Sequence, residues 1–274
     1  MDSSNYDSAL YFSGLKSRKP LEEVLNSLRL TKSCNMDSLH NLMTFAATEG
    51  WSATDVVTAT LNLLDEKRLV NKCMMNTKLA RFPWQLATKS FDHELGRANP
   101  MLTKELSNCS WINAHQNLLF TGGSGLGKTH FAVYLGKQAI SKGYITRFFS
   151  AIELFNEMEK DQIGMVKKLN KVQVLILDDL GHEGQDGHNY ASSLYQLLAA
   201  RYDKALNTII TTNRNVTDWG PALGSPETVK AALDRFLENA VQIEFQGSSH
   251  RLETFAKRKL ELQKKFRTEN DQEG

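Results

Sequence analysis

The 274-residue sequence is short of several features that define specialised classes of protein. Its three cysteines, Cys34, Cys73 and Cys109, are scattered without C-x-x-C spacing, which excludes a disulfide framework and a cysteine-rich zinc site. The formal net charge is only +2, so nucleic-acid binding has to rest on a local basic patch. No apolar run approaches the roughly 20 residues that span a bilayer, and "MDSSNYDSAL" is unlike a signal peptide. We therefore expect a soluble cytoplasmic protein without a membrane partner.

The composition is typical of a globular chain, with 41% hydrophobic and 23% charged residues. Beyond the first third of the chain, short apolar runs alternate with helical patterns. The predicted strands are 117–122, 145–150, 172–180, 207–213 and 240–247, and the predicted helices are 127–142, 150–170, 188–205 and 226–239. This alternation predicts an α/β fold with a five-stranded parallel sheet.

Residues 1–105 have a different pattern, dominated by amphipathic helical segments. The longest covers 52–82, with Ser52 as its expected N-cap. The stretch "FPWQLATKSFDHE" at 82–94 indicates an extended connector. The predicted domains are a helical N-terminal domain over 1–82, a linker over 83–105, a core over 106–250 and a basic C-terminal tail over 251–274.

The stretch "GGSGLGKTH" at 122–130 has the G-x-x-x-x-G-K-[ST] spacing of a P-loop. It follows a predicted strand and opens a predicted helix, as a phosphate-binding loop requires. Glycines let the backbone close around a phosphate, and the N-terminus of the helix favours the bound anion. Lys128 would reach the β- and γ-phosphates of ATP, and Thr129 would ligate Mg²⁺. The residues predicted to bind the nucleotide are Gly122, Gly123, Ser124, Gly125, Leu126, Gly127, Lys128, Thr129 and His130.

The strand "VLILDD" at 174–179 ends in two carboxylates, which is typical of a Walker B motif. Asp178 is the predicted Mg²⁺ ligand, together with Thr129, and Asp179 is the predicted base that orients or deprotonates water. Asp179 is shorter than the glutamate that many related motifs carry, so we expect slow hydrolysis. The nearby cluster His182, Glu183, Asp186 and His188 matches no standard set of metal ligands and predicts a polar loop.

Three more residues extend the predicted site. Asn213 ends the strand "TIITTN", where its amide would hydrogen-bond the attacking water or the γ-phosphate. Arg235 lies near the end of a helix, where it would supply positive charge to a neighbouring subunit, unless it simply pairs with a carboxylate on its own helix. Arg251 in "GSSHR" is a further candidate for nucleotide binding.

These motifs together carry a resemblance to a known family. "GGSGLGKTHFA", "VLILDDLG", "TIITTNR", "DWGPALG" and "LDRFLENAVQIEFQGSSHR" are similar to the IstB/DnaC branch of AAA+ ATPases, and most similar to IstB-like transposition helper proteins. The helices and "FDHE" of the N-terminal third resemble IstB too. The resemblance implies a P-loop AAA+ core. Its usual helical lid would be absent or very short, because only 27 residues follow Gly247 in the 274-residue chain.

The resemblance also implies a function. Such proteins assemble into homo-oligomers with ATP and Mg²⁺ between subunits, where Arg235 would act as an arginine finger and Asn213 as a sensor. They bind duplex DNA and assist a partner transposase (IstA-like) in target selection. Two alternatives remain: a DnaC-like loader of a replicative helicase that acts on single-stranded DNA, and a metabolic P-loop enzyme that works as a monomer.

Two basic segments are candidates for contact with DNA phosphates. One is the helical pattern over 64–82, and the other is "KRKLELQKKFR" at 257–267. Lysine and arginine at such positions neutralise phosphates without reading the base sequence. A basic helix is more often only a solvated face, so both interpretations of these residues stay open. The predicted DNA-binding residues of the first segment are Lys67, Arg68, Lys72, Lys78 and Arg81.

Overall fold

The computed structural model describes residues 20, 23–24, 36–93, 97–181, 190–256 and 258–259. The chain divides into two compact units, Met1–Met74 and Met75–Gly274. The predicted polar loop with His182, Glu183, Asp186 and His188 lies outside the described residues, as does most of the basic tail. In the described ranges, no helix has the length and apolar character that crossing a membrane requires.

The first unit contains helix α3 (Met36–Thr48) and most of helix α4 (Ala53–Leu79), which continues into the second unit. The predicted N-cap of α4 is confirmed. Ser52 Oγ accepts a hydrogen bond from Asp55 N (3.2 Å), and Ser52 N donates to Asp55 Oδ2 (3.1 Å). This reciprocal pair satisfies two amide groups that the helix leaves open at its start. The two helices pack through apolar side chains around Leu39.

The second unit is built on a five-stranded sheet in which every pair of neighbouring strands is parallel, with the order β2-β3-β4-β1-β5. The strands are β1 (Asn117–Gly122), β2 (Thr146–Ser150), β3 (Val174–Asp178), β4 (Asn207–Thr211) and β5 (Ala240–Phe245). The predicted α/β fold is therefore confirmed. The order also places β4 between the P-loop strand and the Walker B strand, so the carboxyl ends of β1, β3 and β4 meet at one edge of the sheet.

The predicted strands 172–180 and 207–213 are longer than β3 and β4, which end at Asp178 and Thr211. Asp179 has a φ of +59°, a left-handed conformation that a strand does not continue through. The chain thus turns at Asp179, so that Asp178 is the last residue of β3, while Asp179 and Asn213 follow their strands.

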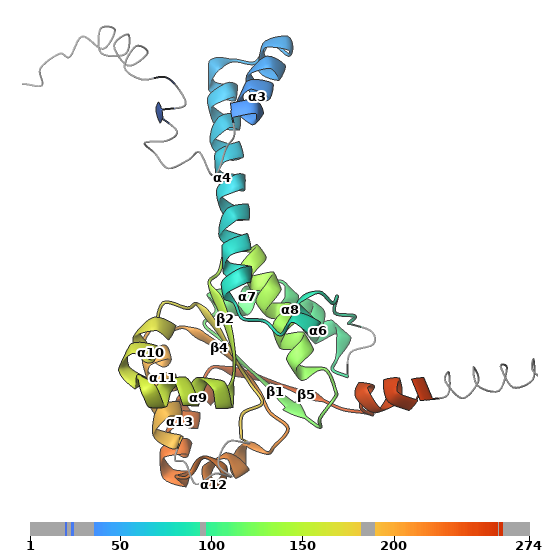
Figure 1. Ribbon diagram of the computed structural model, residues 1–274, viewed down its shortest axis with the longest axis vertical. Coiled ribbons are helices and arrows are strands. Elements are labelled where there is room, and N and C mark those ends of the chain that lie inside the picture. The colour runs from blue at the N-terminus through green and yellow to red at the C-terminus, as the bar shows by residue number, and fades with distance from the viewer. Residues whose placement is uncertain are drawn as a thin grey trace, which may run out of the picture. The chain divides into compact units, whose positions relative to one another are not determined.

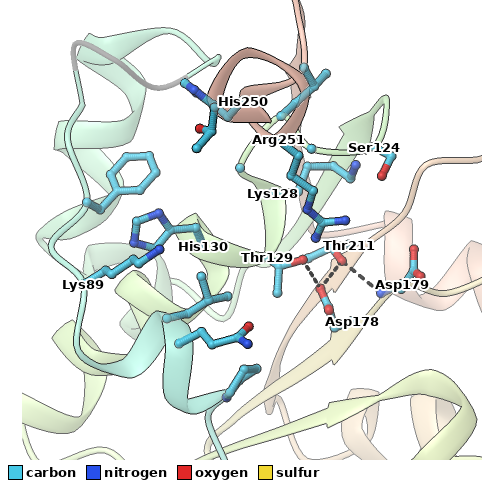
Figure 2. A pocket seen from close by; sticks show the side chains of 18 of the residues that line it. Lys89, Ser124, Lys128, Thr129, His130, Asp178, Asp179, Thr211, His250 and Arg251 are labelled. Carbon is cyan, nitrogen blue, oxygen red and sulfur yellow. Dashed lines mark hydrogen bonds between the residues drawn. The ribbon is translucent and has the colours of Figure 1, made fainter. Parts of the chain in front are cut away.

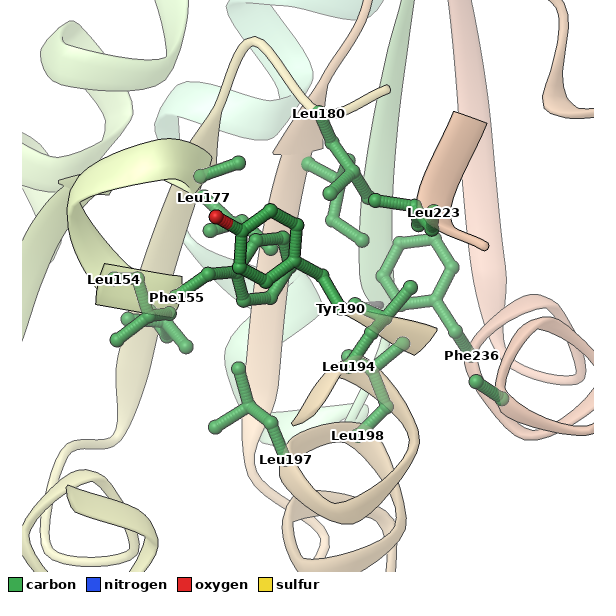
Figure 3. Close-up of a cluster of buried hydrophobic side chains, with 14 of the residues drawn as sticks. Leu154, Phe155, Leu177, Leu180, Tyr190, Leu194, Leu197, Leu198, Leu223 and Phe236 are labelled. Atoms are coloured by element: carbon green, nitrogen blue, oxygen red, sulfur yellow. The ribbon is translucent and has the colours of Figure 1, made fainter. Parts of the chain in front are cut away.

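Helices cover both faces of the sheet (Figure 1). On one face lie α6 (Pro100–Ser107), α7 (Ser110–Asn113) and α8 (Lys128–Ser141). On the other lie α9 (Ala151–Lys160), α10 (Gln162–Leu169), α11 (Ala191–Tyr202), α12 (Trp219–Leu223) and α13 (Pro226–Leu237), with the short 3-10 helix η2 (Val216–Asp218) before α12. Each face of the sheet has its own cluster of buried hydrophobic side chains. Figure 3 shows the cluster beneath α9 to α13, where Leu177 and Leu180 meet Tyr190, Leu194 and Phe236. These two hydrophobic clusters stabilise the sheet that supports the site.

The segment 82–94 was predicted as an extended connector. Its described part, 82–93, instead contains the single-turn helix α5 (Trp84–Ala87) and packs on the core. Phe91 stacks on Tyr134 of α8 with ring centroids 5.4 Å apart. Lys137 Nζ, also on α8, donates a hydrogen bond to Ala87 O (2.9 Å). These tertiary contacts fold the segment onto α8.

Candidate nucleotide-binding site

The P-loop connects β1 to α8, and its geometry depends on glycine. Gly122 has a φ of +132°, and a Cβ there would lie 2.2 Å from Phe245 O of β5. No other residue fits at this position, because both the conformation and the space exclude a side chain. Gly127, the residue before α8, has a φ of +96°. The loop therefore ends directly at the N-terminus of α8, where free backbone N–H groups attract an anion.

A cavity of about 1060 Å³ opens at this edge of the sheet (Figure 2). This volume suits a ligand of the size of a nucleotide. Its lining comes from four parts of the chain. They are the P-loop with the first turn of α8 (Ser124 to His130), the strand ends with Asp178, Asp179, Thr211 and Asn213, the segment from Pro83 to Asp92, and the C-terminal helical residues His250, Arg251, Thr254, Phe255 and Arg258.

Lys128 is the buried cation of the cavity, with only 7% of its surface exposed. Its Nζ donates hydrogen bonds to Gly122 O and Gly123 O, both at 2.7 Å. Burial lowers the pKa of Lys128, while the nearby charges of Asp179 and Asp178 oppose that shift and the charge of Arg251 adds to it. A partly dehydrated amine held against the loop is suited to a phosphate, which would replace carbonyl dipoles with a full negative charge.

Asp178 and Thr129 lie together, as a shared Mg²⁺ site requires. Thr129 Oγ1 donates a hydrogen bond to Asp178 Oδ1 (2.8 Å), and so does Thr211 Oγ1 (2.5 Å) (Figure 2). Burial raises the pKa of Asp178, and these two hydrogen bonds oppose the shift. In the described parts of the chain, no group of three or more His, Cys, Asp or Glu side chains forms a metal cluster. The donors fit Mg²⁺, which takes few protein oxygens and completes its shell with phosphate and water.

Asp179 borders the same cavity, directly after β3. Its backbone N donates a hydrogen bond to Thr211 Oγ1 (3.0 Å), so a single threonine contacts both carboxylate residues. Sequence reasoning missed Thr211. The available signal was its place at the end of a strand next to the Walker B strand, in a run of three polar residues before Arg214.

The structure also brings Asn213, His130 and Arg251 to the cavity. The His130 ring meets Phe91 edge-on, with centroids 5.3 Å apart, and burial is the main cause that lowers its pKa. The imidazole next to this phenyl ring forms part of the wall beside the P-loop.

Arg235 is the one predicted catalytic residue that the structure does not bring to this cavity. It lies on α13, and its guanidinium carbon is 4.9 Å from the ring centroid of Tyr195 on α11. Neither Arg235 nor Tyr195 lines the cavity described above. Within this chain, Arg235 therefore does not contact the site formed by Lys128 and Asp178.

The predicted DNA-binding residues differ in what they contact. Lys67 Nζ donates a hydrogen bond to Ser38 Oγ (2.8 Å) within the first unit. Arg81 pairs with Glu157 (2.7 Å) in the second unit. Arg68, Lys72 and Lys78 have exposed side chains on α4.

Two parts of the cavity wall were not recognised as such from the sequence. One is the segment from Pro83 to Asp92, which was predicted as a linker. The other is the helical stretch over 250–256, which was assigned mostly to a tail and of which only Arg251 was a candidate for nucleotide binding. Their part in the wall depends on tertiary packing against α8 and the P-loop.

A parallel α/β sheet with a P-loop, a Walker B carboxylate and a polar strand end between them defines a P-loop nucleotide-binding protein. Comparison with known proteins narrows this class. The family of IstB-like ATP binding proteins matches residues 24–258. An ATP-binding protein of insertion sequence IS5376 from Geobacillus stearothermophilus is 33% identical over 234 residues, which cover 78% of this chain and 91% of the relative.

A second relative is described as the ATP-binding protein of insertion sequence IS21 from Pseudomonas aeruginosa. It is 30% identical over 185 residues, covering 64% of this chain and 68% of the relative. Among solved structures, the DnaC helicase loader aligns with 60% of this chain and 98% of its own, at 24% identity and a TM-score of 0.48. The chain belongs to the family of IstB-like ATP binding proteins, and is an ATPase. The predicted family is thus confirmed.

Proposed function

We propose that this protein is an ATP-dependent DNA-binding ATPase that assembles on duplex DNA and assists a partner transposase (IstA-like) in target selection and transposition. The family match and the insertion-sequence names of its relatives support the transposition context. The observation that carries the assembly is the position of Arg235, outside the cavity that contains the other proposed catalytic residues.

The residues of the cavity have distinct proposed roles. Lys128 binds the β- and γ-phosphates of ATP, and the glycine-rich loop surrounds them. Thr129 and Asp178, already joined by a hydrogen bond of 2.8 Å, hold Mg²⁺, which neutralises charge on the phosphates when bound. Asp179 accepts the proton of the attacking water, and Asn213 orients that water by a hydrogen bond. Arg251 adds a second cation at the phosphates.

The arginine that P-loop hydrolysis uses in its transition state comes from a neighbouring subunit in this proposal. Arg235 stacks on Tyr195, which holds the guanidinium at the surface of α13 and α11. A neighbour that places its cavity against this surface would complete its site with Arg235. Arginines supplied from outside accelerate hydrolysis by about 10³- to 10⁵-fold in related P-loop enzymes. Hydrolysis at such an interface would loosen the assembly and release DNA.

Exposed Arg68, Lys72 and Lys78 of α4 are the proposed phosphate contacts of the assembly. Lys67 and Arg81 take part less directly, because each already has an intramolecular partner. The proposed contacts are to the backbone of duplex DNA, so they contribute affinity without base readout.

Mixing two inactive variants tests the shared site. Lys128→Ala removes the phosphate contact of its own site but keeps Arg235, whereas Arg235→Ala keeps its own cavity. Each variant alone should hydrolyse ATP at least about 10²-fold more slowly than the wild type, and an equimolar mixture should recover part of the rate. A mixture of Lys128→Ala with Asp178→Asn is the matched control and should recover nothing, since both variants damage the same half of the site.

Full hydrolysis by Arg235→Ala alone, or no recovery in the mixture, would overturn the shared site. Mass photometry with a non-hydrolysable ATP analogue, in the presence of duplex or single-stranded DNA, then tests the proposed assembly on DNA. Large assemblies on duplex DNA support a transposition helper. Assemblies only on single strands indicate a helicase loader, and a monomer under every condition indicates a metabolic P-loop enzyme.

A further inference from the structure

The turn that follows β5 packs directly on the P-loop. This turn covers Gly247 to Arg251, the stretch "GSSHR", and leads into the helical residues 250–256. His250 N donates a hydrogen bond to Gly125 O (3.0 Å). Ser249 Oγ lies 2.1 Å from the place that a Cβ on Gly125 would occupy, so the Ser249 side chain packs directly on the backbone of Gly125. Any shift of this turn therefore moves against the phosphate-binding loop itself.

The same turn is held from its other side by Arg97, which precedes α6. Gln246 N donates a hydrogen bond to Arg97 O (2.8 Å). The Arg97 side chain then passes Gly247, with its Cδ 3.3 Å from where a Cβ would stand, and its Nη2 contacts Glu253 Oε1 at 2.7 Å. Ser248 Oγ bonds to the same carboxylate oxygen. Gly247 has a φ of +114°, which the turn needs in order to pass so close to Arg97.

These contacts flank Arg251 along the chain. His250, the residue before it, bonds to the P-loop, and Glu253, two residues after it, bonds to Arg97. Arg251 itself lines the cavity beside Lys128 (Figure 2). The Arg97 and Glu253 side chains are 29% and 37% exposed, and an ion pair this exposed adds little to stability by itself. The position of the Arg97–Glu253 ion pair is its important property, since the pair joins the start of the C-terminal helix to the segment that precedes α6.

We propose that Arg97 is a positioning residue for ATP binding. Through Glu253 it holds the first turn of the C-terminal helix against the P-loop, and this directs Arg251 into the cavity. Arg97 does not line the cavity, so its effect on the nucleotide passes through Arg251. The inference rests on the proposed binding of ATP in this cavity.

Equilibrium binding of a fluorescent ATP analogue to the full chain tests the proposal. Arg97→Ala should weaken binding by about tenfold, because the guanidinium of Arg251 is then misplaced and no longer makes its charge-assisted hydrogen bond to a phosphate. Glu157→Ala is the matched control. It breaks the Arg81–Glu157 pair, which has the same N–O distance of 2.7 Å but lies away from the cavity, and should leave the affinity unchanged.

A double-mutant cycle separates positioning from a general loss of structure. Arg251→Ala should weaken binding as much as Arg97→Ala, and the double variant should be no weaker than Arg251→Ala alone. A double variant that exchanges the two charges, Arg97→Glu together with Glu253→Arg, should bind the analogue more tightly than Arg97→Ala and restore much of the wild-type affinity. Losses that add in the double variant, or unchanged affinity in Arg97→Ala, would overturn the proposal.

Lys128→Ala keeps this result separate from the assignment of the cavity. If Lys128→Ala binds the analogue as tightly as the wild type, ATP lies elsewhere and the proposed site itself is wrong. If Lys128→Ala abolishes binding while Arg97→Ala has no effect, the cavity is correct and only the role of Arg97 fails.

Discussion

The single residue Asp178 is expected to lower the stability of the fold at neutral pH, although it is needed for the proposed Mg²⁺ site. Burial raises the pKa of its carboxyl, although Thr211 and Thr129 donate hydrogen bonds to it. A carboxyl whose pKa is higher in the folded state binds its proton more tightly there. Folding is therefore favoured as the pH falls, and the ionised form at neutral pH costs stability.

We expect Asp178→Asn to melt at a temperature equal to or above that of the wild type at pH 7, without nucleotide. The amide oxygen can still accept both threonine hydrogen bonds and carries no buried charge. The difference in melting temperature between Asp178→Asn and the wild type should shrink as the pH is lowered through the raised pKa of Asp178, because the wild-type carboxyl then becomes neutral. The same variant should lose roughly 10²-fold of its Mg²⁺-dependent ATPase rate. Calorimetry and a phosphate-release assay measure the two effects.

The exposed substitution Asp203→Asn serves as the control and should change neither property. A clear fall in the melting temperature of Asp178→Asn at pH 7 would show that the ionised carboxylate stabilises the fold, contrary to this account.

The buried side chain of Arg201 connects several helices and strands by hydrogen bonds. Its side chain is 1% exposed and donates hydrogen bonds to Thr208 Oγ1 (2.9 Å) and to the carbonyls of Leu169 (2.9 Å) and Asn207 (2.6 Å). Further bonds reach Val172 O and Gln173 O. Burial lowers the pKa of Arg201 to about 9, so it remains charged at neutral pH. One guanidinium therefore joins the end of α10 and the starts of β3 and β4 to α11.

Replacing Arg201 should destabilise the sheet more than any surface change. We expect Arg201→Ala to lower the free energy of unfolding by roughly 3–5 kcal/mol, because several buried carbonyls lose a hydrogen-bond donor. Arg201→Lys should recover only part of this, since one ammonium has three donors and no planar fork. Lys204→Ala, an exposed change close by, is the control. Urea denaturation measures all three, and a loss below about 1 kcal/mol in Arg201→Ala would contradict the role.

The sequence predicted the type of these elements better than their ends. Apolar runs identified all five strands, because a strand buried on both faces consists of consecutive apolar residues. The segment 82–94 was wrongly predicted as extended. Its folding depends on Phe91 and Lys137, which act across the chain and leave no periodic pattern in the segment itself.

For the whole molecule, the proposed assembly predicts a salt-dependent affinity for duplex DNA. The net charge of +2 provides no general attraction, so exposed Arg68 and Lys72 should account for a measurable share. We expect Arg68→Ala with Lys72→Ala to weaken duplex binding equally across unrelated sequences. The slope of log K against log salt should fall by about 2, close to 0.9 for each phosphate that the variant no longer neutralises. Fluorescence anisotropy at several salt concentrations measures both.

Lys204→Ala with Lys230→Ala removes the same charge from other exposed positions and is the matched control. An equal fall in slope for both pairs would mean that DNA responds to net charge alone, and would remove α4 from the proposed DNA surface.

The sequence by itself determined the chemistry at the centre of the site. The P-loop and the Walker B residues are runs of neighbouring residues whose spacing is set by local backbone geometry, and such runs can be read without a fold. Only the tertiary structure decided what surrounds them. Thr211 meets Asp178 through the order of the strands, and Arg97 meets Glu253 from 156 positions away. Contacts of this kind arise from the packing of distant segments, which no spacing along the chain records.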